Sequence, residues 1–348
     1  MPVSPVDSVG PAFEHTKEQL FRPFRLGQWT RLAFVGLLAG ELSSGGGCNF
    51  QAPNLSHAQR QDFLAVPHLD PALVAPLIIL AAILVPLFWL LLLYISSRMR
   101  FLLFDSVITK HCSIRAMWHA RREAGLRYFV WQIIFSLVAF GGMAVIVGVP
   151  ALFAFLLGWF RAPREHLVGL ILAGVVVFFL FLGWMLLTLF VHVFTKDFVV
   201  PQMALENVSA FEGWRKLISM IEAEKGRYAG YAGMKVVLAL GAAFVIGIVT
   251  LIFIVILLIP AGGVGVISVL LAKATGLALA WNVFTITLAV VAGCCLLLVF
   301  LYGLSLISVP VIVFFPAYSI HFFAARYPRL SNLLYPPLPP APGTAPIG

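Results

Sequence analysis

The chain has 348 residues, of which 61% are hydrophobic and only 11% are charged, and its mean hydropathy is +1.01. A soluble domain of this length carries about a quarter charged residues, so the composition excludes an ordinary soluble protein and predicts an integral membrane protein. The formal charge of +9 is typical of cytoplasmic loops rich in Lys and Arg, and we expect no nucleic-acid partner.

Hydrophobic runs bounded by charged residues predict an all-α membrane fold with about six transmembrane helices. A span needs about 20 apolar residues to cross a hydrocarbon core of about 30 Å. Five runs meet this length, and the first reaches only about 20 Å at 1.5 Å per residue but is counted as a short span. The predicted spans are Thr30–Leu42, Pro71–Ser96, Tyr128–Gly158, Leu167–Thr195, Tyr228–Pro260 and Leu277 to about Val309.

The distribution of basic residues predicts the orientation of these spans. With six spans, the face that carries both termini holds all but four of the 23 Lys and Arg residues. The four on the other face are Arg60, Arg161, Arg164 and Lys273. Because cytoplasmic loops carry an excess of Lys and Arg, we expect a cell (inner or cytoplasmic) membrane protein with both termini in the cytoplasm.

Similar segments precede three pairs of spans and indicate an internal repeat. The stretches Phe101–Trp118 and Phe198–Trp214 both end in Ser-x4-Trp, and Phe13–Trp29 has the same outline. The predicted repeat is an interfacial helix followed by a helical hairpin, within one domain over residues 1–330. The repeats cover about 13–100, 101–197 and 198–309, with a partial fourth start at 310–330 and a disordered, Pro-rich tail at 331–348.

The segments that link the hairpins show helical spacing of apolar and charged residues. Ser113–Arg127 and Ser209–Glu224 are each predicted to form one amphipathic interfacial helix. Ser209 and Glu212 fit a capping box at the start of the second. By analogy with the repeat, Pro310–Pro316 is predicted to be a further linker at the cytoplasmic face.

No sequence motif for phosphate binding, metal hydrolysis or nucleophilic catalysis occurs in the chain. Acidic residues avoid the centres of the spans, and the four cysteines lack metal-ligand spacing. We therefore expect no enzymatic activity, no catalytic residue, no cofactor and no metal.

Two groups of polar residues are candidates for a functional role. Arginines near the cytoplasmic boundary serve membrane topology, or they contact the headgroups of anionic lipids. Polar residues inside the spans bond neighbouring helices, or they line a path for a solute. The headgroup candidates are Arg98, Arg100, Arg115, Arg121 and Arg122, and the intramembrane candidates are Gln132, Asn282 and Thr285.

The segments Lys196–Pro201 and Ala210–Trp214 resemble those of a group of uncharacterised prokaryotic multi-pass membrane proteins. That group is similar to the membrane domain attached to some glycerophosphodiester phosphodiesterases. The catalytic domain of those enzymes is absent from this chain, so the resemblance implies a membrane fold and no activity.

Two functions remain open from the sequence. The first is a non-catalytic membrane scaffold, assembly or lipid-organising component whose partners are the lipid bilayer and its anionic lipids. The alternative is a transporter or channel for a neutral or lipid-like solute, which would need a polar cavity lined by residues such as Gln132, Asn282 and Thr285.

Overall fold

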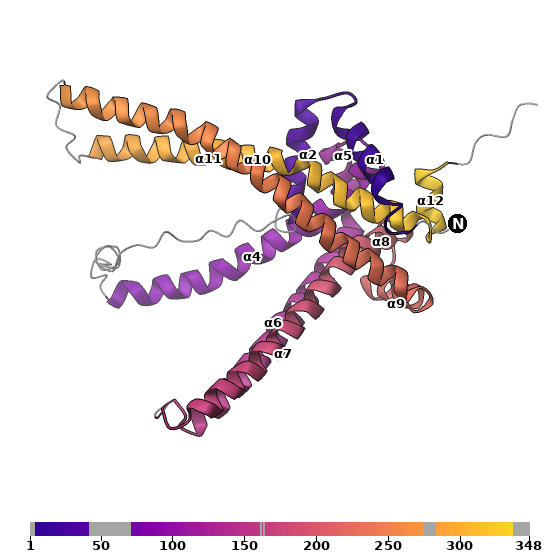
Figure 1. The fold of residues 1–348 in the computed structure, drawn as a ribbon, viewed down its shortest axis with the longest axis horizontal. Coiled ribbons are helices and arrows are strands. Elements are labelled where there is room, and N and C mark those ends of the chain that lie inside the picture. Colours follow the sequence, from indigo (N-terminus) through magenta and orange to yellow (C-terminus); the bar gives the residue numbers. More distant parts are fainter. Residues whose placement is uncertain (1–3, 42–70, 161, 163, 275–282, 337–348) are drawn as a thin grey trace, which may run out of the picture. The chain divides into compact units, whose positions relative to one another are not determined.

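The computed structural model describes residues 4–41, 71–160, 162, 164–274 and 283–336, and all regular elements in these ranges are helices (Figure 1). Long runs of Leu, Val, Ile and Phe favour helices in a membrane because a helix bonds all its backbone groups internally. The helices are α1 (Val9–Phe21), α2 (Leu26–Leu38), α4 (Pro71–Ile108), α5 (Ile114–Ala120), α6 (Arg122–Leu156), α7 (Leu167–Phe194), α8 (Val200–Glu206), α9 (Ala210–Ala223), α10 (Lys225–Ala274), α11 (Val283–Ala324) and α12 (Pro328–Leu334). A five-residue π-helical segment, η2 (Thr195–Val199), joins α7 to α8.

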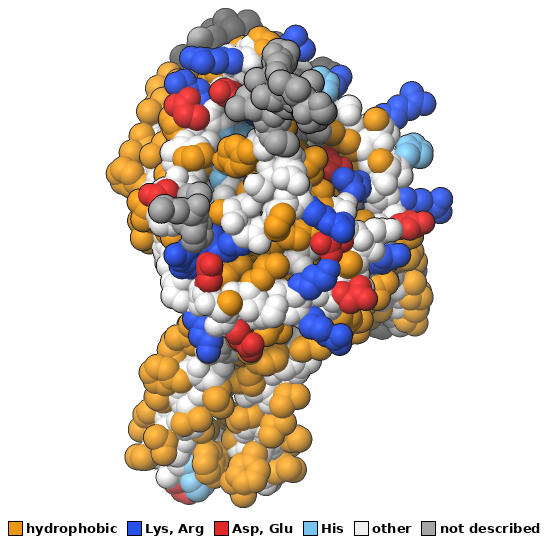
Figure 2. Space-filling view, turned by 90° about the vertical axis from the view of Figure 1, so that its right-hand side faces the viewer, with side chains coloured by type: hydrophobic (Ala, Val, Ile, Leu, Met, Phe, Trp, Pro, Cys, Tyr) orange, Lys and Arg blue, Asp and Glu red, His pale blue; other side chains and the backbone are white. Residues whose placement is uncertain are grey.

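Among the described residues, five helical stretches are long and apolar enough to cross a membrane. Their most apolar parts have almost no residues buried within the protein, and Figure 2 shows hydrophobic side chains coating the long α6–α7 hairpin. Lipid must cover this surface, which confirms the prediction of an all-α membrane protein. The stretches are Ile78–Ile108, Arg122–Leu156, Leu167–Glu206, Lys225–Pro260 and Val290–Ala324.

The first predicted span, Thr30–Leu42, is not among them. The helix at this position, α2, has 13 residues and lies along the C-terminal end of α4. Arg31 Nη1, from the middle of α2, donates to Cys112 O at 3.4 Å, and Arg100 Nη2 donates to Ala39 O at 2.7 Å where α2 ends. Thus α2 runs antiparallel to the last turns of α4, beyond its most apolar part.

The chain divides into two compact units. Unit 1 comprises Met1–Val3, Arg115–Lys225 and Ser319–Gly348, and unit 2 comprises Ser4–Ile114 and Gly226–Tyr318. In unit 1, α6 and α7 form an antiparallel hairpin, in which Trp184 Nε1 donates to Ala139 O at 3.0 Å. Gly142 makes room for this indole, because a Cβ there would lie 2.1 Å from Trp184 Cζ2.

Unit 2 contains the apolar parts of α10 and α11, which contact through aromatic rings. Phe253 of α10 stacks on Phe300 of α11 with ring centroids 6.3 Å apart, and it also covers Gly303. Nearer the other end, Tyr231 stacks on Tyr318 at 5.2 Å, and Tyr318 Oη donates to Pro5 O at 3.1 Å. These aromatic contacts hold α10, α11 and the start of the described chain together within the unit.

The predicted linker Pro310–Pro316 is instead a continuous part of α11, which contains both prolines. Val309, Ile312 and Val313 in and beside this segment are almost fully buried by protein. Packing of these side chains offsets the backbone hydrogen bonds that proline removes from a helix. The prediction of a separate linker was therefore wrong.

Of the two segments that were each predicted to form one interfacial helix, only the second does so. Residues 113–127 do not form one helix, because α5 ends at Ala120 and α6 begins at Arg122. The second, α9, agrees with the predicted range, and its capping box is confirmed. Ser209 N donates to Glu212 Oε2 at 2.9 Å, and Glu212 N donates to Ser209 Oγ at 3.3 Å.

The prediction that a disordered tail begins at residue 331 was wrong for the first residues of that range. Residues 328–334 form α12, whose first turn starts with a proline, and Leu330 is fully buried and fixes the helix to unit 1. The part of the predicted tail from residue 337 onward lies outside the described residues.

Candidate functional site

Two of the predicted headgroup arginines, Arg98 and Arg100, lie inside unit 2. Each is only 5% exposed. Arg98 Nη1 donates to Tyr94 Oη at 2.9 Å, and Arg100 donates to Ala39 O where α2 ends. The last carbonyls of a helix have no partner within it, so Arg100 caps α2. These two guanidinium groups hold unit 2 together and are not at its surface.

The predicted headgroup arginines of unit 1 have two different environments. Arg121 is half-buried, and its Nη1 donates to Ala204 O near the end of α8. Arg127 caps the same end by donating to Asn207 O. Arg115 and Arg122, by contrast, are exposed on the segment that leads into the spanning helix α6. Of the five arginines predicted from the sequence, these two remain accessible.

The three predicted intramembrane polar residues are described to different extents. Gln132 is half-buried on α6 in unit 1. Thr285 belongs to α11, where only its helical backbone is described, and Asn282 lies outside the described residues. A common cavity for the three therefore stays a prediction. A separate apolar groove on α4 is lined by Leu84, Val85, Leu87, Phe88 and Leu91.

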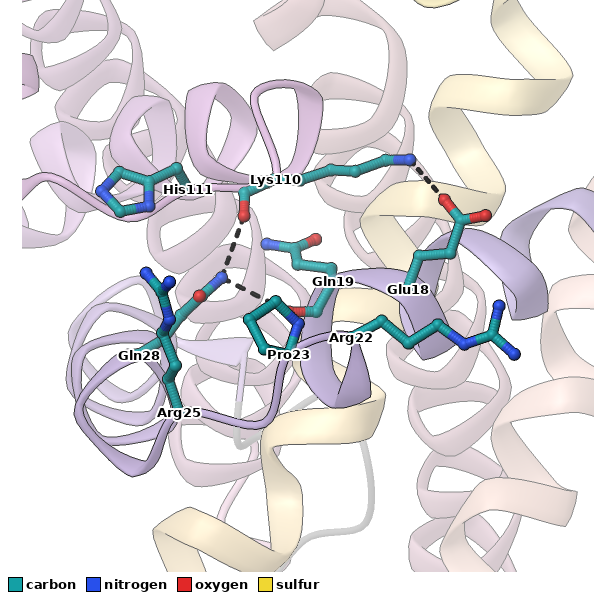
Figure 3. Close-up of a pocket in the computed structure, with 8 residues that line it drawn as sticks. All are labelled: Glu18, Gln19, Arg22, Pro23, Arg25, Gln28, Lys110 and His111. Atoms are coloured by element: carbon teal, nitrogen blue, oxygen red, sulfur yellow. Dashed lines mark hydrogen bonds and ion pairs between the residues drawn. The ribbon is translucent and has the colours of Figure 1, made fainter.

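A polar pocket of about 390 Å³ lies in unit 2 between α1, the start of α2 and the loop after α4 (Figure 3). Four of its eight lining residues are Arg, Lys or His, and only one is acidic. In the sequence, the Arg and Lys residues of this pocket only add to the basic excess of the predicted cytoplasmic face, because the two segments that form the pocket lie far apart in the chain. The lining residues are Glu18, Gln19, Arg22, Pro23, Arg25, Gln28, Lys110 and His111.

Two glutamines shape this basic pocket, because their hydrogen bonds join α1 and α2 to the end of α4. Gln28 Nε2 donates to Lys110 O at 2.9 Å and to Gln19 O at 3.4 Å, as the dashed lines in Figure 3 show. Gln19 Nε2 in turn donates to Ser106 O at 2.9 Å. Lys110 adopts a left-handed backbone conformation with φ 56°, which ends the helix and turns its carbonyl toward Gln28.

The single carboxylate of the basic pocket is already neutralised. Lys110 Nζ lies 2.6 Å from Glu18 Oε2. This hydrogen bond lowers the pKa of Glu18, so the carboxylate stays ionised and paired at neutral pH. Arg22 and Arg25 are therefore left as excess positive charge at the pocket.

The Cys and His side chains near the basic pocket include two buried groups, Cys112 and His15. Burial raises the pKa of the Cys112 thiol to about 11, so almost no nucleophilic thiolate forms at neutral pH. His15 is buried, and its Nε2 donates to Val107 O at 2.8 Å; burial also lowers its pKa. Within the described ranges, no three His, Cys, Asp or Glu residues are grouped as metal ligands would be.

Comparison with protein families places almost the whole chain in one family. The profile of a family described as a family of unknown function (DUF7544) matches residues 3–333. No curated protein and no solved structure matches the chain.

Proposed function

The chain belongs to this family of unknown function, DUF7544, and from that premise we propose that it is a non-catalytic membrane component that organises anionic lipids. The observation that carries the proposal is the exposure of Arg115, in α5, and of Arg122, the first residue of the apolar helix α6. Trp118 lies between them and is half-buried, as an indole at a membrane interface would be. Arginines at this depth attract phosphate headgroups by about 1 kcal/mol each.

We propose a six-segment architecture for this function, with the pairs α2–α4, α6–α7 and α10–α11. In this arrangement α2 is the short first member of its pair, since it packs antiparallel to the end of α4. The basic residues around α1, α5 and α9 then share the cytoplasmic face of a cell membrane, with both termini on that face. Each pair follows an interfacial segment, as the repeat predicts.

The resemblance to the membrane domain attached to some glycerophosphodiester phosphodiesterases fits a role without catalysis and stays a proposal. Transport of a neutral or lipid-like solute is the alternative function. It requires a polar path through the spans, which Gln132, Asn282 and Thr285 would have to line.

Replacing Arg115 and Arg122 together by Gln tests the lipid proposal. The full-length protein is purified in mild detergent from membranes of known composition, and its bound lipids are quantified by mass spectrometry. We expect the ratio of anionic to zwitterionic lipid to fall roughly thirtyfold, because the loss of two charges at about 1 kcal/mol each removes about 2 kcal/mol of attraction.

Arg164→Gln is the matched control for this experiment. Arg164 is also exposed, but it lies beyond the opposite end of α6, next to the start of α7. Its loss should leave the lipid ratio unchanged. An unchanged ratio in the Arg115/Arg122 variant would reduce those arginines to a topological role.

A further inference from the structure

We infer that the basic pocket of unit 2 is a binding site for a phosphate group carried by a small molecule or a lipid headgroup. The site is distinct from Arg115 and Arg122, because all its lining residues belong to unit 2. Its volume of about 390 Å³ lies within the range of small-molecule sites. The inference therefore does not depend on the lipid contacts proposed for α6.

Two unengaged guanidinium groups supply the affinity for an anion. Neither Arg22 nor Arg25 makes a side-chain hydrogen bond or an ion pair with another described residue. Figure 3 shows them extending to opposite sides of Pro23, Arg22 on the side of Glu18 and Arg25 on the side of His111. The planar, forked donors of arginine match the geometry of phosphate oxygens better than any other side chain.

Lys110 is a third cation at the basic pocket, and its charge is balanced by Glu18. Its ion pair with Glu18 is exposed, with 45% and 47% of the two side chains accessible. Exposed pairs of this kind contribute little, typically below about 1 kcal/mol. The ammonium group can therefore turn from Glu18 toward a bound phosphate, and the four charged side chains Arg22, Arg25, Lys110 and Glu18 keep a net charge of +2 in either arrangement. Gln28 continues to hold the backbone carbonyl of Lys110.

One buried atom at the basic pocket lacks a hydrogen bond. Gln19 is 4% exposed, and its Nε2 faces Ser106 O, a carbonyl that can only accept. The amide orientation is thereby fixed, and Gln19 Oε1 has no donor among the described residues. Leaving a buried acceptor unpaired is unfavourable, so a hydroxyl or ammonium donor, from the ligand or from water bound with it, would complete this site.

The test measures binding of two probes to the full-length protein in detergent. Inorganic phosphate represents a free source, and a short-chain phosphatidylglycerol represents a headgroup, each followed by isothermal titration. We expect Arg22→Gln with Arg25→Gln to weaken binding of the responding probe roughly tenfold, since hydrogen bonds to charged groups are the strong ones. Both arginines are exposed, so this variant should fold.

Arg164→Gln with Arg215→Gln serves as the matched control, because it removes the same charge from two exposed arginines that lie outside both the pocket and the proposed lipid contacts. Binding of inorganic phosphate that only the pocket variant weakens would identify a free phosphate ligand. If phosphatidylglycerol binds and inorganic phosphate does not, and only the pocket variant weakens that binding, the ligand is a lipid headgroup. Equal losses in both variants, or no binding of either probe, would overturn the inference whatever the outcome for lipid retention at α6.

Discussion

At the scale of single residues, Glu206 connects three helices of unit 1. Its Oε1 accepts from Tyr327 Oη at 2.6 Å, before the start of α12, and its Oε2 pairs with Lys216 of α9. Arg329 lies 3.6 Å from the same carboxylate. Burial and the Glu206 carboxylate raise the pKa of Tyr327, so the phenol stays protonated and donates at any physiological pH.

Tyr327→Phe tests the contribution of this hydrogen bond. We expect the free energy of unfolding to fall by about 1–2 kcal/mol, because a buried bond to a charged acceptor is lost while the ring keeps its packing. Denaturant unfolding of the detergent-solubilised protein, followed by circular dichroism, measures this change. Lys216→Met should cost less, since 45% of the Lys216 side chain is exposed. The reverse order would show that the ion pair between α8 and α9 contributes more to stability than the hydrogen bond of the phenol.

At the scale of secondary-structure elements, the ends of two helices support the predicted repeat. Lys110 and Asn207 have positive φ values of 56° and 54°, and each lies nine residues after the Phe that opens its repeat, Phe101 or Phe198. In both cases a side chain from another helix bonds the carbonyl of the left-handed residue. The repeat itself stays a prediction, and the shared turn is a structural feature in its favour.

The capping box of α9 gives a prediction at this scale. Ser209→Ala removes the oxygen that accepts from Glu212 N, and we expect a loss of about 1 kcal/mol in the stability of the helix. Hydrogen exchange of the first-turn amides should accelerate about fivefold, without a change in the middle of α9. Ser219→Ala is the control, because Ser219 Oγ only donates to Lys216 O on the exposed side of the same helix. Equal acceleration by both variants would contradict a role for the cap.

At the scale of the whole molecule, the packing of α1 bears on membrane topology. Gln19 and His15 bond Ser106 O and Val107 O, so α1 lies beside the cytoplasmic end that we propose for α4. The N-terminal part then shares a face with the loop after α4. Six membrane crossings are consistent with this arrangement, whereas five would place the two termini on opposite faces.

Reporter fusions decide between these topologies. Fusions at the N-terminus, Arg215 and Arg329 should all report the cytoplasm, and a fusion at Arg164 should report the opposite side. The physical reason is the excess of Lys and Arg on the first face. A periplasm-type signal at the N-terminus, with a cytoplasmic signal at Arg329, would leave five crossings and rule out the pairing of α2 with α4 as a hairpin.

The sequence alone determined the membrane class and the five long helices, and it located the cap of α9. These features depend on local properties: a bilayer requires about 20 consecutive apolar residues, and a capping box lies within four positions. The excess of basic residues predicts an orientation from charge alone, and this orientation stays a prediction. The same local reasoning did not show that α11 continues through Pro310 and Pro316.

Only the tertiary structure decided which charged residues are accessible. Arg98 and Arg100 look like surface charges in the sequence, but they are buried because α2 packs on the end of α4 and supplies a carbonyl for Arg100. Arg22 and Arg25 looked like ordinary loop charges, and they line a pocket because Gln28 and Gln19 bond the distant end of α4. Burial and pocket formation depend on contacts between segments far apart in the chain, which hydrophobic patterning does not encode.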